Sequence, residues 1–99
     1  MTVEEKIIEH LKEVYDPEIP VNIYDLGLIY GISVDGEKAY VVMTLTAPGC
    51  PVADILLDDV KQAALAPDEI NEAEVELTFE PPWDKSMMSE EARLELGFF

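Results

Sequence analysis

Cysteine is almost absent from this chain of 99 residues, which carries only Cys50. One cysteine excludes a disulfide within the chain and any site that needs several thiolates from the same chain. Histidine is equally rare, with His10 alone. Closed zinc sites need three or four Cys and His ligands at short spacings, so we do not expect a zinc module. The fold must therefore be held together by its apolar core.

Basic residues are also scarce, because six Lys and Arg stand against 22 Asp and Glu and give a formal charge of −16. Such a field repels the phosphates of nucleic acids and anionic lipid head groups, so we expect neither nucleic acid nor a membrane as a partner. The chain has no apolar run of the roughly 20 residues that span a bilayer, and residues 1–11 do not resemble a signal peptide. We therefore expect a cytoplasmic protein.

Apolar residues at helical spacing predict three helices. The first covers about residues 3–14 behind a capping box formed by Thr2 and Glu5. The second covers about residues 51–65 and ends before Pro67; its predicted apolar face consists of Val52, Ile55, Leu56, Val60, Ala63 and Ala64. A short third helix is expected from Ser89, as its cap, to just before Gly97.

Alternating apolar and polar residues predict three strands. Residues 28–34 and 40–46 form a hairpin, for which Asp35-Gly36 predicts a type I′ turn. In residues 73–80, Ala73, Val75, Leu77 and Phe79 should be buried and the intervening Glu residues exposed. The order α-β-β-α-β-α then predicts an α+β two-layer sandwich, in which helices cover a small three-stranded mixed sheet in one domain, residues 1–99.

Cys50 precedes Pro51, which is typical of the first residue of a helix. As the N-cap, its sulfur would lie beside unpaired amides at the positive end of the helix dipole, and this position favours the thiolate. A thiolate attacks electrophiles or binds soft metals. The alternative is a small buried cysteine that packs under the sheet.

Three carboxylates, Asp16, Glu18 and Asp25, lie in the loop before the first predicted strand, whereas the loop with Cys50 follows the second. Antiparallel pairing brings these two loops to the same edge of the sheet. The carboxylates are thus candidates for oxygen ligands or for groups that tune the thiol. The alternative role of each is to form a turn or to solvate the end of a helix.

A rigid corner of Pro81, Pro82 and Trp83 follows the last strand, and Met87 and Met88 come soon after it. Trp83 and Met88 are candidates for a partner-docking patch, although closure of the core under the final helix explains them equally well. An enzyme is not favoured, because His10 is remote from Cys50 and no glycine-rich phosphate loop is present.

Four stretches in series, which together cover nearly the whole chain, resemble one known family. They are residues 16–23, 25–30, 44–46 with the PGCP motif at 48–51, and 79–83 through 88–89. On these residues the chain resembles the SufT-like metal-sulfur cluster biosynthetic proteins, a family of iron-sulfur cluster assembly domains that also contains PaaD-like proteins. The extra C-terminal cysteines of the PaaD-like branch are missing here.

The resemblance implies an auxiliary factor in iron-sulfur cluster assembly, or in cluster delivery to recipient proteins, instead of an enzyme. It implies Cys50 as the metal-binding or reactive thiol, and Asp16 and Glu18 as an acidic motif that supports it. We expect Asp25 and Thr46 to complete this supporting site. The implied partners are iron-sulfur scaffold or carrier proteins and recipient apoproteins, with a P-loop ATPase carrier and a second copy of the chain as further candidates.

A conventional cluster takes four thiolate ligands, so one chain with one cysteine does not hold a cluster alone. We therefore expect any iron or iron-sulfur cluster to be bound transiently and shared with a second copy, a small thiol or a client cysteine. The alternative function is an adaptor that binds no metal and recruits clients or scaffolds, with a structural role for Cys50.

Overall fold

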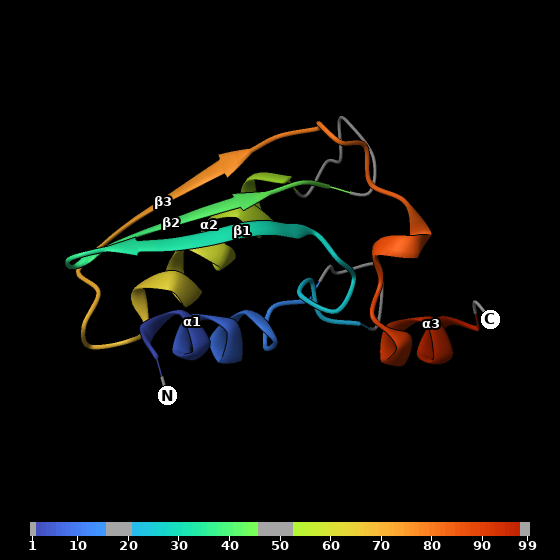
Figure 1. Cartoon of the computed structure of the whole chain (residues 1–99), viewed down its shortest axis with the longest axis horizontal. Coiled ribbons are helices and arrows are strands. Elements are labelled where there is room, and N and C mark those ends of the chain that lie inside the picture. The colour runs from blue at the N-terminus through green and yellow to red at the C-terminus, as the bar shows by residue number, and fades with distance from the viewer. Residues whose placement is uncertain (1, 16–20, 46–52, 98–99) are drawn as a thin grey trace.

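The computed structural model describes residues 2–15, 21–45 and 53–97 of the chain. Along these residues the elements follow in the order α-β-β-α-β-α, with one short 3-10 helix before the last α-helix (Figure 1). This order confirms the predicted α+β class. The bounds are α1 Val3–Leu11, β1 Ile29–Asp35, β2 Lys38–Met43, α2 Ala53–Leu65, β3 Glu72–Leu77, the 3-10 helix η1 Lys85–Met87, and α3 Glu90–Leu96.

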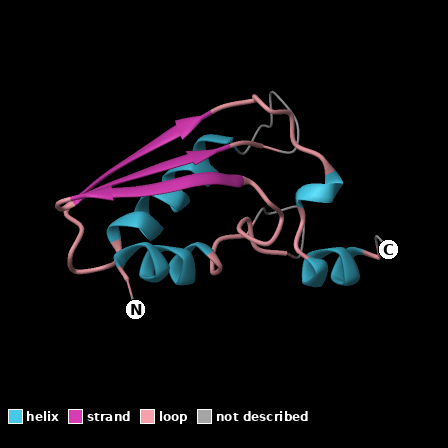
Figure 2. Cartoon of the chain, viewed as in Figure 1, coloured by secondary structure: helices cyan, strands magenta, loops and turns pink. Residues whose placement is uncertain are grey.

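The strands form a mixed sheet of order β1-β2-β3 (Figure 2). β1 and β2 are antiparallel and pair from Ile29 with Met43 to Asp35 with Lys38. β2 and β3 are parallel and pair from Lys38 with Glu72 to Met43 with Leu77. β2 is therefore the central strand, and the predicted three-stranded mixed sheet is confirmed.

The hairpin turn differs from the predicted type. Gly36, the first of its two central residues, has a φ of 62°, and no non-glycine residue in the described part of the chain has a positive φ. A type I′ turn needs a positive φ at both central residues, so the type I′ prediction is wrong. A positive φ at the first central residue is the pattern of a type II′ turn, which suits the twist of a hairpin equally well.

Helix α1 begins as the sequence predicts and ends earlier. The amide of Glu5 donates to Thr2 Oγ1 at 3.1 Å and the amide of Thr2 donates to Glu5 Oε1 at 3.3 Å, which completes the capping box. The helix ends at Leu11 and not at residue 14, because Val14 accepts a hydrogen bond from the amide of Ile23 at 2.9 Å. The spacing of apolar residues along the helix cannot predict this contact between distant residues.

The core lies between the sheet and the two helices α1 and α2, which contact each other and the sheet. On α2, the buried residues Leu56, Val60, Ala63 and Ala64 confirm most of the predicted apolar face. The buried core consists of Ile7, Leu11, Val21, Ile23, Leu26, Leu28, Ala39, Val41, Met43, Leu45, Leu56, Val60, Ala63, Ala64, Ile70, Ala73, Met88 and Ala92.

Two residues predicted to be buried are exposed. Ile55 is 63% exposed, because α2 turns Leu56 and Val60 toward the sheet and leaves Ile55 on its solvent side. Phe79 is 38% exposed, because β3 ends at Leu77 and the strand alternation ends with it. Similarly, β2 covers Lys38–Met43 instead of residues 40–46. No helix within the described residues has the length and apolar character needed to cross a bilayer.

Candidate functional site

One end of the sheet brings together the segments that the sequence analysis singled out. β2 and β3 end there and β1 begins there, as their pairing and Figure 1 show. The amide of Thr44, just beyond β2, donates to the carbonyl oxygen of Leu28 at 2.8 Å. The chain passes from Leu45 into residues 46–52 and returns at Ala53, the first residue of α2. Leu45, the last described residue before this segment, therefore lies beside the loop that precedes β1.

Four members of the predicted site, Cys50, Asp16, Glu18 and Thr46, lie outside the described residues. The structure describes the remaining three, Asp25, Trp83 and Met88, and all three belong to the same end of the molecule. Their contacts join the loop before β1 to the chain that follows β3.

Asp25 organises the loop before β1. Its backbone amide donates to Asn22 Oδ1 at 2.9 Å and so closes a turn. In return, Asn22 Nδ2 donates to Asp25 Oδ2 at 2.8 Å. The carbonyl oxygen of Asp25 also accepts a hydrogen bond from the amide of Ser89 at 2.8 Å. These bonds are the turn-forming role that the sequence left open for Asp25. They also fix its partly buried carboxylate in one orientation.

Trp83 and Met88 fasten the last segment onto the same loop. The indole Nε1 of Trp83 donates to the carbonyl oxygen of Leu26 at 2.8 Å, and the ring is partly buried against the core. Met88 is 3% exposed and belongs to the core. Met88 therefore closes the core, which is the alternative that the sequence left open. It offers almost no surface to a partner in this conformation.

A groove of about 720 Å³ lies beside these contacts, and we call it the sheet-end groove. Tyr30 is the extra residue of a β-bulge between Ile29 and Gly31, and a bulge re-aims the side chain that it carries. The Tyr30 hydroxyl donates to the carbonyl oxygen of Pro81 at 2.8 Å and lies 3.5 Å from Met87 Sδ. The groove is lined by Gly27, Ile29, Tyr30, Val42, Glu76, Thr78, Glu80, Pro81 and Met87.

The sheet-end groove combines apolar walls with negative charge. Ile29, Val42 and Met87 supply apolar surface, whereas Glu76 and Glu80 supply two exposed carboxylates. Such a lining suits an apolar side chain that has a cationic neighbour. The sequence does not predict this role of Tyr30, because neither the bulge nor the return of the chain after β3 can be seen in a strand pattern.

The described part of the chain offers no set of ligands for a resident metal. Within residues 2–15, 21–45 and 53–97, no three His, Cys, Asp or Glu side chains lie together in an arrangement that would hold a metal ion. His10 lies on α1, where its Nδ1 is 3.9 Å from Glu13 Oε2.

Comparisons with known proteins agree on one family. A family model described as iron-sulfur cluster assembly protein matches residues 4–77. The chain is 52% identical over 99 residues to an Fe-S protein maturation auxiliary factor from Porphyromonas gingivalis, which covers 99% of this chain and 94% of that protein. It is 44% identical over 85 residues to the Fe-S protein maturation auxiliary factor SufT of Staphylococcus aureus, which covers 85% of this chain and 97% of that protein.

A solved structure is similar to this chain in both fold and sequence. The crystal structure of a domain of unknown function from Bacillus anthracis matches with a TM-score of 0.90 and 39% sequence identity. The match covers 98% of this chain and 93% of that chain. The likeness therefore extends beyond residues 4–77 to the segment that carries Trp83 and Met88.

Proposed function

Because the chain belongs to the iron-sulfur cluster assembly protein family, we propose that it is an auxiliary factor in the maturation of iron-sulfur proteins, with Cys50 as a transient thiolate ligand. The names of the Porphyromonas and Staphylococcus relatives support the maturation role. The proposed role of Cys50 has a different support, namely the position of Leu45, the last described residue before the segment that carries Cys50: its neighbour Thr44 bonds to Leu28, next to the Asp25 loop. That observation carries the proposal.

The chemistry of Cys50 in this proposal is ligand exchange. The thiol releases its proton to solvent, and the thiolate sulfur binds iron that a scaffold or carrier protein presents, while one thiolate of that donor leaves the iron and takes up a proton. A cysteine of the recipient apoprotein then replaces Cys50, so no electron is gained or lost. One thiolate binds the cargo weakly enough to let it leave. In this proposal Asp16, Glu18, Asp25 and Thr46 form the supporting site of the thiolate.

The remaining ligands come from another molecule: a second copy of the chain, a small thiol or the client itself. Anaerobic reconstitution with iron and sulfide should therefore give less than one cluster per chain at low protein concentration. A stable, stoichiometric cluster on the monomer would contradict this sharing. An ATPase carrier of clusters fits the scheme as the donor, because this chain carries no phosphate loop of its own.

The sheet-end groove provides the recognition surface in this proposal. Its apolar walls and the carboxylates of Glu76 and Glu80 suit a flexible client segment that presents an apolar residue next to a basic one. Trp83 and Met88 act behind this surface. Trp83 holds the Leu26 loop, and Met88 anchors the chain in the core.

Substitution of Cys50 tests the proposal against the adaptor alternative. In a Staphylococcus aureus strain that lacks its own relative, the native chain should restore a cluster-dependent enzyme, whereas Cys50→Ser should lower that activity at least about 10-fold. The purified variant should unfold at nearly the native denaturant concentration. If Cys50 is structural, as in a pure adaptor, maturation stays near normal and the variant loses roughly 1 kcal/mol of stability.

A further inference from the structure

The outer edge of β3 presents backbone groups that pair with no other part of the described chain. The amide of Thr78 donates to the carbonyl oxygen of Met43 at 2.8 Å, so Thr78 faces β2. Backbone direction alternates along a strand, so Ala73, Val75 and Leu77 direct their N–H and C=O groups away from β2. β3 is an edge strand in the sheet order, and this edge can therefore accept a further strand.

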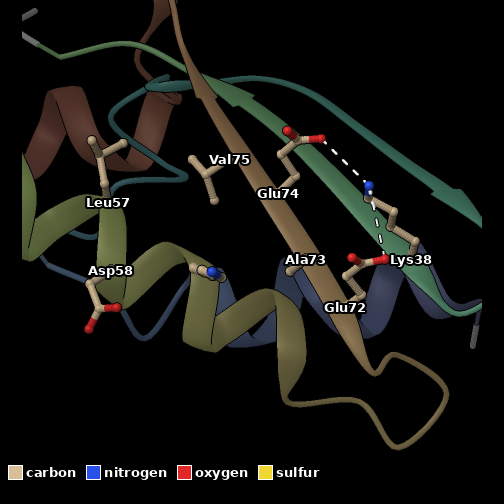
Figure 3. A pocket seen from close by; sticks show the side chains of 8 residues that line it. Lys38, Leu57, Asp58, Glu72, Ala73, Glu74 and Val75 are labelled. Carbon is tan, nitrogen blue, oxygen red and sulfur yellow. Dashed lines mark ion pairs between the residues drawn. The ribbon is translucent and has the colours of Figure 1, made fainter.

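A groove of about 500 Å³ follows this edge between β3 and α2. Figure 3 shows Val75 and Leu57 on one side of β3, and Glu72, Glu74 and Lys38 on the other. Val75 and Leu57 are both half-buried. We call the side with Val75 and Leu57 the lower face and the side with Glu72 and Glu74 the upper face. A strand added along the edge would therefore meet apolar side chains on the lower face and charged side chains on the upper face.

The upper face is acidic. Glu72, Glu74 and Glu76 recur at every second position of β3 and are all exposed. Lys38 on β2 is shared between two of them, with its Nζ 4.0 Å from Glu72 Oε2 and 3.8 Å from Glu74 Oε2. One ammonium group cannot neutralise two carboxylates, so the upper face keeps a net negative charge. On the helix side the groove is also lined by Asp58 and Lys61, one residue of each sign.

This pattern selects the partner. A second copy of the chain would bring the same row of Glu residues against itself, and like charges directly opposite one another destabilise strand pairing. The same row therefore protects the edge from self-association, a common device on edge strands, while it leaves the edge open to a cationic strand. An incoming strand would place Lys or Arg over the carboxylates and apolar residues over Val75 and Leu57.

We propose that the outer edge of β3 binds an extended cationic segment of a partner protein, in which Lys or Arg alternates with apolar residues, as a fourth strand of the sheet. Backbone hydrogen bonds to Ala73, Val75 and Leu77 supply the pairing, and the two faces supply the specificity. The surface includes none of residues 46–52. It is therefore independent of any metal-binding role of Cys50.

A blocked seven-residue peptide that alternates Lys and Val tests the pairing on the whole chain. At saturation, amide hydrogen exchange at Ala73, Val75 and Leu77 should slow at least about 10-fold, because these amides gain partners. The amides of Glu74 and Glu76 already face β2 and should change less than about twofold. A peptide that alternates Glu and Val should leave all of them unchanged. Slowed exchange elsewhere, or no binding of the cationic peptide at millimolar concentration, would overturn the proposal.

Charge-neutralising variants distinguish binding at the β3 edge from attraction of the peptide by the net charge of the chain. Glu72→Gln with Glu74→Gln should weaken binding of the Lys-Val peptide at least about 10-fold. The matched control neutralises two exposed carboxylates outside the groove, Glu9→Gln with Glu95→Gln, and should weaken binding less than about twofold. Equal weakening by the two pairs would mean that only net charge attracts the peptide, and the edge site would be wrong. Urea unfolding of each variant confirms that it is folded.

Discussion

Trp83 holds the loop before β1 in place, because its indole Nε1 donates a hydrogen bond of 2.8 Å to the carbonyl oxygen of Leu26. Leu26 is fully buried, and its neighbour Asp25 accepts a second hydrogen bond from Ser89. Two bonds from the segment after β3 thus end on adjacent residues of one loop. The geometry of the sheet-end groove depends on this attachment.

Replacing Trp83 by Phe should destabilise the fold. Trp83→Phe removes the donor, leaves the Leu26 carbonyl without that partner and shrinks the packed ring, so we expect a loss of about 1 to 3 kcal/mol in urea unfolding. Tyr30→Phe removes the exposed hydrogen bond to Pro81 and serves as the comparison. It should cost less, because solvent can replace an exposed donor. Equal losses would show that burial does not set the strength of the Trp83 contact.

Gly27 is required by both its backbone angle and its surroundings. Its φ is 81°, and a β-carbon at this position would collide with the backbone carbonyl of Met87. Gly27→Ala should therefore cost more than the about 1 kcal/mol that the left-handed conformation alone imposes on alanine. Gly31→Ala is the matched control, since nothing lies within 4 Å of its added carbon. The free energies of unfolding compare the two, and an equal effect would contradict the close approach to Met87.

Glu69 should make stability depend on acid pH. The hydrogen bond from Lys6 Nζ, aided by the Glu69 backbone amide and the charge of Lys6, holds the pKa of Glu69 below its ordinary 4.5. A carboxyl with a lowered folded-state pKa adds stability above 4.5, and this contribution is lost as pH falls through the lowered value. Glu69→Gln should thus be less stable than the native chain at neutral pH, with a difference that disappears in acid.

Urea unfolding at a series of pH values checks this prediction. Both side chains are exposed, so the difference should be small and should shrink in high salt. Lys6→Gln removes the other partner and should show the same pH profile. A difference that persists unchanged into acid would assign the effect of Glu69→Gln to something other than the ion pair.

The sequence predicted the fold well wherever the signal was local. The Thr2 and Glu5 capping box, the helix cap at Ser89 and the left-handed Gly97 are short-range patterns, and each is present. The errors arise where distant residues meet. Val14 leaves the helical pattern because it pairs with Ile23, and Phe79 is exposed because the chain leaves the sheet after Leu77.

The candidate site was predicted less completely, for the same physical reason. Antiparallel pairing was enough to predict that the Asp25 loop and the end of β2 share an edge of the sheet. The sheet-end groove depends on Tyr30 in a bulge and on Met87 from a segment 57 residues away, and the contact between them follows from no periodicity. Cys50, Asp16, Glu18 and Thr46 remain predictions, because they lie outside the described residues.

The central position of β2 has a consequence for folding during synthesis. β2 meets β1 through a two-residue turn, a contact of low sequence separation that forms as soon as both strands leave the ribosome. It meets β3 only after the whole of α2 has been translated. Until then, the nascent hairpin exposes the apolar side chains of Ala39, Val41 and Met43. The acidic charge of the growing chain would then keep neighbouring nascent chains apart until α2 packs against that surface.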